Sequence, residues 1–387
     1  MREIWRQGDL SVDAILQAGD FAHIREDWER LATHPAVDPD AYMSRLQDDG
    51  DVVGPAVLVA RRAGVVVGLL VGRIEAKRLD FLVGHLPVYR VRARVLAGFE
   101  HGVIGADDPD VAAGYVGSIM HLLRRRTADF AHLACVDISA PIRRWARELP
   151  SRFCRSWVTD TDARWSLAIP ATFEEFVASR SRNTRANIRR HEKQLLHAHP
   201  DVRVAVFGRG AAETLDALAD VMEVCRKTYQ FKLGLAPLCH PLARKTWDEG
   251  CRRARLVLAL VYIGGRPVAF SYAHIYKSIA LFMTPGYDPA FASLHVGEYS
   301  LLKLVQGLIA ERDVAILDYG QGYLQYKESF GTSCTQEGHV RLFAPTPKGI
   351  YLNIVRTVTA GASSFLLAAA ERLRVKNALK RILRRLR

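Results

Sequence analysis

Two pairs of apolar segments, each joined by a two-residue turn, place the strongest constraint on the fold. Residues Val57 to Ile74 read VLVARRAGVVVGLLVGRI, and residues Val257 to Ile275 read VLALVYIGGRPVAFSYAHI. A turn of Ala63-Gly64 or Gly264-Gly265 between apolar runs predicts a β-hairpin. The two turns lie 201 positions apart, which indicates two tandem copies of one α/β unit. The alternative, that any α/β protein contains such hairpins, stays open at this point.

Helical and strand patterns alternate along the rest of the chain, which predicts the α/β class with mixed central sheets. The best boundary is Pro170-Ala171-Thr172, because Thr172 and Glu175 form a capping box that opens a helix. We therefore expect an N-terminal domain over 1–170, a C-terminal domain over 171–348 and a basic helical tail over 349–387. We expect helices at 21–32, 111–126, 141–149, 173–179, 184–197, 211–229 and 241–253, and further strands at 131–137, 165–169, 202–207 and 279–284.

The composition is that of an ordinary folded protein with 49% hydrophobic and 25% charged residues. The N-terminal residues are charged throughout, unlike a signal peptide. The apolar run Val65 to Val71 is far shorter than the about 20 residues that cross a bilayer, so we expect a cytoplasmic protein. The six cysteines form no C-x-x-C pair, which argues against a zinc site or a disulfide framework, and we expect no metal.

The net charge of +13 is concentrated in two places. Residues Ser179 to Lys193 carry six basic side chains and one glutamate, and residues Glu371 to Arg387 carry eight and one. The first run predicts a helix with Arg185 and Arg189 on a cationic face, which suits phosphate groups, although a solvated face is equally consistent. The second predicts an amphipathic helix that binds anionic lipid or packs on protein. The preceding apolar run, Phe365 to Ala370, is expected to be core.

The segment from Ala292 to Ser333 carries the clearest chemical pattern. It reads as a turn, a helix from Glu298 to Arg312, a short strand from Val314 to Leu317, and a loop that begins at Asp318. Backbone N–H groups at a helix start can bind phosphate, so the turn before Glu298 predicts a site for a phosphate-bearing cofactor.

This order of elements resembles the GNAT-type acyltransferases of the BioF2-like and CelD-like group, which are related to the FemABX aminoacyl transferases. Tyr287-Asp288-Pro289-Ala290 is similar to the group's GYDPA element, and Asp318-Tyr319-Gly320 with Tyr326-Lys327 is similar to its D-[FY]-G…YK signature. The turn here reads SLHVGEY, which departs from the Pro-Gly or Gln-x-x-Gly-x-Gly form of related enzymes. The resemblance implies tandem GNAT-like domains. The first copy lacks these elements, so we expect it to be catalytically silent.

The resemblance implies a site for acyl transfer from acyl-CoA to an amine. Ser293, His295, Val296 and Gly297 are the expected donor-binding residues, because they form the turn at the helix start. Asp318 is the candidate general base, with capping of the next loop as an equal alternative.

Three further residues are candidates for stabilising charge in the reaction. By resemblance, Lys327 faces the reacting centre, where a cation would stabilise developing negative charge. Tyr326 or Tyr287 would protonate the leaving thiolate, and the sequence does not choose between them. Arg185, Arg189 and Gly320 are the expected substrate-binding residues.

We therefore expect an N-acyltransferase that acts on an amino sugar or amino-acid derivative, on a lipid- or nucleotide-linked acceptor, in exopolysaccharide or cell-envelope biosynthesis. One alternative is a FemABX-like transferase that uses aminoacyl-tRNA. Another is a catalytically inactive subunit that binds a membrane or a polymer. An oligomer is compatible with the sequence.

Overall fold

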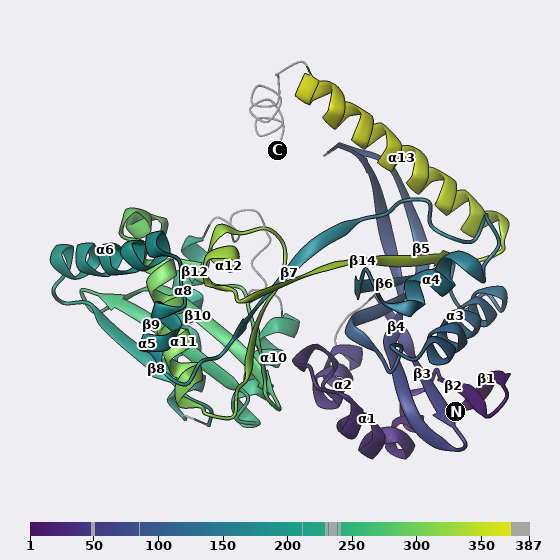
Figure 1. The fold of residues 1–387 in the computed structure, drawn as a ribbon, viewed down its shortest axis with the longest axis horizontal. Helices are drawn as coiled ribbons and strands as arrows, with labels where there is room; N and C mark the ends of the chain where they lie inside the picture. Colours follow the sequence, from purple (N-terminus) through teal and green to yellow (C-terminus); the bar gives the residue numbers. More distant parts are fainter. Residues whose placement is uncertain are drawn as a thin grey trace. The chain divides into compact units, whose positions relative to one another are not determined.

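Each predicted hairpin lies in a different structural unit of the chain (Figure 1). The computed structural model describes residues 1–47, 51–84, 86–210, 212–228, 231, 238 and 241–372. Its first unit comprises Met1–Leu31, Gly50–Thr161 and Glu337–Arg387, and its second comprises Ala32–Asp49 and Asp162–Gln336. Each unit is therefore assembled from segments that are far apart in the sequence.

The first unit contains seven strands in the order β1-β2-β3-β4-β5-β6-β14 among the described residues. Every neighbouring pair is antiparallel except β5 and β6, which run parallel. The strands are β1 (Arg2–Gln7), β2 (Leu10–Ile15), β3 (Val52–Arg62), β4 (Val65–Val83), β5 (Leu86–Ile104), β6 (Phe130–Asp137) and β14 (Ser333–Phe343). The helices are η1 (Ala18–Ile24), α1 (Arg25–Leu31), α3 (Pro109–Arg124), α4 (Pro141–Glu148) and α13 (Pro347–Arg372).

The second unit has the strand order β7-β13-β11-β10-β9-β8, with β12 beside β10. Here the parallel pair is β11 and β13, and the other pairs are antiparallel. The strands are β7 (Thr161–Ala168), β8 (Arg203–Phe207), β9 (Leu256–Ile263), β10 (Arg266–Tyr276), β11 (Ile279–Phe282), β12 (Gly286–Tyr287) and β13 (Ile316–Gln321). The helices are η2 (Pro35–Val37), α2 (Pro39–Gln47), α5 (Phe173–Ala178), α6 (Arg182–Ala198), α7 (Glu213–Asp216), α8 (Leu218–Lys227), α10 (Pro241–Arg252), η4 (Pro289–Leu294), α11 (Val296–Ala310) and α12 (Gln325–Phe330).

The two units repeat one order of elements. The hairpin β3–β4 is followed by β5, α3 and β6, and the hairpin β9–β10 is followed by β11, α11 and β13. In both turns the two central residues have positive φ, which matches the tight type I′ hairpin that the sequence predicts. In both units the long helix connects the two parallel strands. The α/β class with mixed sheets is thus confirmed.

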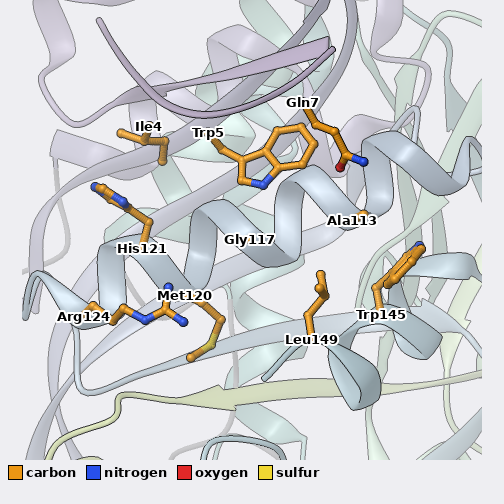
Figure 2. A pocket seen from close by; sticks show the side chains of 10 residues that line it. All are labelled: Ile4, Trp5, Gln7, Ala113, Gly117, Met120, His121, Arg124, Trp145 and Leu149. Carbon is orange, nitrogen blue, oxygen red and sulfur yellow. The ribbon is translucent and has the colours of Figure 1, made fainter. Parts of the chain in front are cut away.

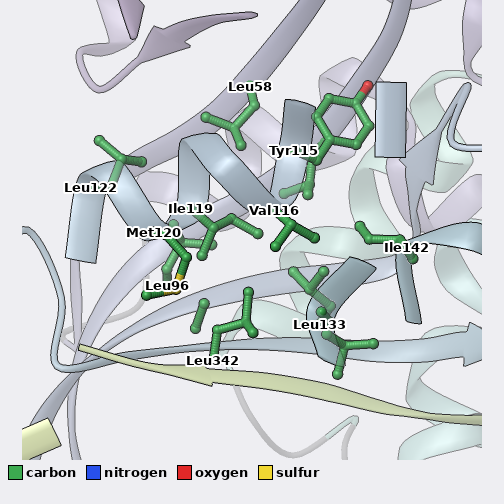
Figure 3. Packing of buried hydrophobic residues seen from close by; sticks show 14 of the residues in the cluster. Leu58, Leu96, Tyr115, Val116, Ile119, Met120, Leu122, Leu133, Ile142 and Leu342 are labelled. Atoms are coloured by element: carbon green, nitrogen blue, oxygen red, sulfur yellow. The ribbon is translucent and has the colours of Figure 1, made fainter. Parts of the chain in front are cut away.

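Helix α3 supplies most of the helical side of the first unit's core (Figure 3). Val116 and Ile119 of this helix are fully buried, together with Leu96 of β5 and Leu133 of β6. Leu342 of β14 completes this cluster, although it lies about 200 positions further along the chain. The apolar face of α3 thus packs against the sheet and forms the core of the first unit.

The observed units differ from the predicted boundaries at 170 and 348. The segment Ala32–Asp49 joins the second unit through ion pairs that the sequence pattern did not indicate: Asp40 contacts Arg253 at 2.6 Å, and Asp38 pairs with Arg255. Helix α13 belongs to the first unit, where Leu352 is buried. The predicted N-cap at Thr172 is confirmed, since Thr172 Oγ1 accepts a hydrogen bond from the Glu175 backbone at 3.1 Å, whereas the Glu175 carboxylate accepts from the Ala171 backbone at 3.2 Å and not from Thr172.

The end of α13 differs from the expectation of a core segment. Phe365 is 73% exposed and Leu366 is 48% exposed, because no other described element covers this face of the helix. Among the described helices, none is both long and apolar enough to cross a bilayer. The predicted amphipathic helix over 371–387 lies outside the described residues from position 373 onward.

Candidate functional site

The site begins where two parallel strands of the second unit separate. Strand β11 pairs with β13 from Ile279–Ile316 to Leu281–Asp318. Beyond this point the chain after β11 turns back, and β12 pairs with β10 instead. Gly286 makes this return feasible, because a Cβ there would lie 2.4 Å from the Phe270 ring. Strand β13 meanwhile continues to Gln321, paired only with β7 on its other edge.

This separation opens a cavity of about 500 Å³. Three of the predicted catalytic side chains line it: Tyr287, Tyr326 and Lys327. Its other lining residues are Thr228, Phe282, Met283, Thr284, Pro285, Gly286, Pro289, Tyr319 and Leu324. The volume and the mostly apolar walls with a few polar groups are those of a small-molecule site.

Three aromatic rings form one wall of the cavity. Phe282, Tyr319 and Tyr326 contact one another edge to face, with ring centroids 5.8 to 6.1 Å apart. Burial raises the pKa of Tyr326 to about 12, so its phenol keeps its proton at neutral pH. Burial also raises the pKa of Tyr319, whose hydroxyl is buried and has no hydrogen-bond partner in the described structure.

Lys327 is buried beside the loop that follows β13. Its Nζ donates hydrogen bonds to the carbonyl oxygens of Gln321 at 2.5 Å and Gly320 at 3.2 Å. Gly320 and Gly322 both have positive φ, which turns the loop back toward the lysine. Lys327 and Gly320 are therefore in contact, and the lysine stabilises the end of β13 beside the cavity.

Asp318 lies on the other face of β13 and does not line the cavity, because successive side chains of a strand alternate in direction. It is buried, and its Oδ2 lies 2.5 Å from Arg164 Nη1 and 3.0 Å from His34 Nε2. The backbone N–H of Gly320 donates to its Oδ1 at 2.7 Å. These contacts are those of a carboxylate that positions β13, and they do not place it as a base in the cavity.

His34 is a member of this cluster that the sequence did not indicate. Its Nδ1 accepts a hydrogen bond from the Ala36 backbone, so the hydrogen on the neutral ring lies on Nε2, which faces Asp318. His34 and Asp318 are 284 positions apart, and no local motif connects them.

The start of α11 forms a second, smaller cavity. It measures about 230 Å³ and is lined by His295, Val296 and Gly297 together with Tyr287 and Tyr326, and also by Phe282, Pro285, Ala292, Glu298 and Leu301. The backbone N–H groups in the first turn of a helix have no intrahelical acceptors and remain free for a ligand. Three of the four predicted donor-binding residues thus lie at one cavity, which shares Tyr287 and Tyr326 with the larger one.

Close packing fixes the shape of this turn. His295 precedes α11 in the left-handed conformation with φ of 55°. A Cβ at Gly297 would lie 2.9 Å from the Tyr287 ring, so only glycine lets that ring lie against the helix start. Ser293, the fourth predicted residue, is exposed and lies outside the cavity lining; its carbonyl accepts a hydrogen bond from Gln194.

His191 of α6 joins the turn and was not identified from the sequence. Its ring stacks on His295, with centroids 3.5 Å apart and planes at 6°, and its Nδ1 lies 3.0 Å from Glu298 Oε1. Burial, together with the neighbouring His191 charge, lowers the pKa of His295. The three groups lie close enough for a metal, but the nitrogen lone pairs of two parallel rings lie in separate planes and do not converge on one ion.

The basic helix α6 places its two predicted substrate-binding arginines differently. Arg185 Nη1 donates to the carbonyls of Ala178 and Arg180 at 3.0 and 2.7 Å, so this side chain caps the end of α5. Arg189 is exposed, and within the described structure its side chain makes no hydrogen bond or ion pair. Of these two arginines, only Arg189 therefore remains available to a ligand.

The first unit contains a cavity of a different kind (Figure 2). It measures about 450 Å³ and lies over α3, where the Trp5 ring rests on Gly117. Its lining includes Trp145, His121 and Arg124, with Ile4, Gln7, Ala113, Met120 and Leu149. These residues include no counterpart of the Tyr326-Lys327 pair.

Comparison with known proteins finds a matching family model and solved structures of similar fold. Residues 182–328 match the family model described as an acetyltransferase (GNAT) domain. The chain is similar to the solved structure of FemX, with a TM-score of 0.56 and 11% sequence identity over 85% of this chain and 98% of FemX. It is also similar to a conserved protein of unknown function from Bacteroides thetaiotaomicron VPI-5482, with a TM-score of 0.50 and 12% identity over 86% and 99% of the two chains.

A tandem GNAT protein from the clavulanic acid biosynthesis pathway has a TM-score of 0.46 and 12% identity, over 87% of this chain and 99% of that one. No curated protein matches the sequence. The matched family region lies wholly in the second unit, and the repeated order of elements extends the same fold to the first. The predicted tandem GNAT-like α/β fold is confirmed, whereas membership of the BioF2-like and CelD-like group stays a prediction.

Proposed function

We propose that the protein transfers an acyl group from acyl-CoA to an amine of an amino sugar or amino-acid derivative, in exopolysaccharide or cell-envelope biosynthesis. The observation that carries the proposal is the separation of β11 from β13 beside the start of α11, which creates two cavities that share Tyr287 and Tyr326. The matched GNAT region, residues 182–328, contains the starts of α11 and α12 and the strands β11 and β13. The N-terminal unit is proposed to be catalytically silent, in keeping with its different cavity.

The two cavities would bind different parts of the acyl-CoA donor. The N–H groups of Val296 and Gly297 would bind the pyrophosphate at the positive end of α11, beside His295. The thioester would then lie in the larger cavity, against Tyr326. The amine nitrogen attacks the thioester carbon, the carbon–sulfur bond breaks, and the proton lost by the amine ends on the departing thiolate.

Tyr326 is the group best placed to assist the departing sulfur. Its phenol is protonated at neutral pH and borders both cavities, so it can donate a hydrogen bond to the developing thiolate. Tyr287 borders the same cavities but is 41% exposed, which weakens any hydrogen bond that it makes. Lys327 is proposed to keep the end of β13 in position for catalysis, through the carbonyls of Gly320 and Gln321.

A FemABX-like reaction with aminoacyl-tRNA is the second candidate. It is favoured by the fold similarity to FemX and by the exposed cationic residues of α6, including Arg182, Arg189 and Lys193. A polynucleotide donor would release counterions from such a surface, so its binding would weaken steeply with salt. Contact of the basic tail, 373–387, with an anionic membrane is a further proposal.

Isothermal titration with acetyl-CoA and a longer acyl-CoA tests the donor. We expect binding by the wild type and at least tenfold weaker binding by Gly297→Glu, because the added carboxylate would repel the pyrophosphate. Gly297→Ala adds the same steric contact with Tyr287 without charge, and Gly19→Glu adds a carboxylate at an exposed glycine with no atom within 4 Å of its Cβ position. Equal losses in Gly297→Ala and Gly297→Glu would instead indicate a steric effect.

Absence of wild-type binding to either acyl-CoA would refute the proposed donor. Titration with aminoacyl-tRNA at two salt concentrations then distinguishes the second candidate from a subunit without transferase activity.

A further inference from the structure

The long hairpin of the first unit ends in an exposed apolar tip. Leu82, Leu86 and Val88 are 44%, 54% and 55% exposed. The tip is fastened to α13, because Ser363 Oγ donates to the Leu82 carbonyl at 3.3 Å and accepts from the Gly84 backbone at 3.0 Å. Phe365 and Leu366 follow within one turn of the helix, and both are exposed. Two elements therefore expose apolar side chains at this end of the unit, and exposed apolar side chains that gather in one region mark contact surfaces.

Arginines follow the apolar tip along the exposed face of the hairpin. Arg78 and Arg92 lie directly opposite each other in the β4–β5 register, and Arg94 lies on the same face two positions further along β5. Within the described structure, these three side chains make no ion pair or hydrogen bond. The neighbouring Arg90 pairs with Asp80 at 3.2 Å.

The pairing of Arg78 with Arg92 opposes the stability of the sheet, since like charges opposite each other repel. The fold therefore gains nothing from these two charges. An anionic partner would neutralise both, and it would do so beside the apolar tip.

The opposite face of the hairpin is packed, so the tip is held on a fixed support. Tyr89 contacts Tyr351 of α13 with ring centroids 5.9 Å apart. Leu79, Phe81 and Val91 pack against the buried cluster that contains Leu352. One face of the hairpin thus packs against α13, while the other carries Leu82 and, further from the tip, the arginines. Leu86, which pairs with Val83, lies at the end of the hairpin on the packed face.

We propose that this tip binds the surface of an anionic lipid bilayer. Leu82, Leu86 and Val88, with Phe365 and Leu366, would enter the boundary between headgroups and acyl chains, and Arg78, Arg92 and Arg94 would contact lipid phosphates. A nucleic acid fits this surface less well, because Leu82, Leu86 and Val88 are aliphatic and offer no stacking ring to a base. None of these residues lines the cavities of the second unit. The lipid-binding proposal therefore does not depend on the proposed reaction.

Sedimentation with vesicles of phosphatidylcholine, with or without about one third phosphatidylglycerol, tests the proposal with the full chain. We expect the wild type to bind the anionic vesicles selectively. Arg78→Ser/Arg92→Ser is expected to lower the partition coefficient by about 30-fold, because each arginine near an anionic surface strengthens binding by a factor of about five. Leu86→Ser/Val88→Ser is expected to lower it by at least tenfold, because buried apolar area drives insertion.

The matched controls change exposed residues elsewhere in the first unit. Arg124→Ser/Arg125→Ser removes the same charge, and Val65→Ser removes a side chain that is 62% exposed; both are expected to bind like the wild type. A Leu86→Trp variant adds a direct readout, a blue-shifted emission on anionic vesicles.

Binding of wild-type strength by both tip variants, or an unshifted emission from the Leu86→Trp variant, would overturn the proposal. So would tip variants that lose tRNA binding or self-association while their vesicle binding is unchanged, since these results assign the surface to a nucleic acid or a second copy.

Discussion

At the residue scale, the cavity chemistry centres on Tyr326. The sequence left Tyr326 and Tyr287 as equal candidates for assisting the thiolate. The structure separates them by burial, since Tyr326 is the half-buried one and Tyr287 is 41% exposed. A hydrogen bond made in a water-poor site contributes more to catalysis than one exposed to solvent.

Removal of the Tyr326 hydroxyl is therefore expected to impair the chemical step. We expect Tyr326→Phe to lower kcat by about 100-fold while the KM for acyl-CoA changes less than about threefold, because the ring wall is preserved. Release of free thiol in steady-state assays with an amine acceptor gives both constants. Tyr287→Phe is the matched control, and a larger loss of kcat in this variant would reverse the assignment of roles.

The sequence located most of this site because the signature residues are contiguous. Tyr326, Lys327, Val296 and Gly297 lie in short segments whose order alone brings them to one end of the sheet. Asp318 was assigned to the cavity, yet strand alternation turns it toward partners supplied by other segments.

Those partners could not be predicted, because His34 and Arg164 reach Asp318 through tertiary contacts over 284 and 154 positions. Arg185 likewise was read as a ligand for substrate, whereas its guanidinium caps a neighbouring helix.

At the element scale, the hairpins could be predicted because turn chemistry is local. Ala63-Gly64 and Gly264-Gly265 adopt the positive φ values that a two-residue turn requires. The register of β5 could not, because its 19 residues pair along most of β4 and then beside β6, and no local signal fixes either partner. The tip of this hairpin is functional surface on our proposal, and the pattern there reads as an ordinary loop.

Half-buried histidines in one strand of each unit predict acid sensitivity. Burial lowers the pKa of His132 in β6 to about 3 and that of His274 in β10 to about 4. A folded-state pKa below the unfolded value of about 6.5 means that the unfolded chain binds more protons, so stability is full above that pH and falls as the pH drops below it.

Each histidine should lower the free energy of unfolding by about 1 kcal/mol between about pH 7 and about pH 5.5. Urea unfolding at the two pH values measures this loss, and His274→Asn is expected to reduce it by the share of one histidine. His23→Gln, at an exposed position, serves as the control. An unchanged pH dependence in His274→Asn would show that this residue is not the source.

At the scale of the whole molecule, the units are interleaved along the chain. The segment Ala32–Asp49 inserts into the second unit, where Lys277 Nζ donates to the Ala32 carbonyl at 2.6 Å and Arg253 pairs with Asp40. Burial raises the pKa of Asp38, and the Arg255 charge opposes this effect. Sequence patterns indicate elements and local boundaries. They do not predict that a short segment joins a distant unit through ion pairs.

A fragment of residues 171–348, the domain that the sequence delimits, is therefore expected to fail to fold. It lacks both the 32–49 segment and β7, which pairs with β13. Far-UV circular dichroism during heating should show a cooperative transition for the full chain and none for the fragment. A cooperative melt of the fragment would show that the missing segments are dispensable.

In the full chain, Arg255→Gln leaves Asp38 without this partner and should cost about 3 kcal/mol of stability.

The position of β14 beside β6 has a consequence for synthesis on the ribosome. Domains usually fold in turn as the chain emerges, with the N-terminal one first. Here the sheet of the first unit is incomplete until β14, which ends at Phe343, has been synthesised. Every described element of the second unit has been translated before then. The first unit therefore cannot be completed until the second has been made. Nascent chains stalled before residue 333 should therefore carry an open edge at β6, a natural substrate for chaperones.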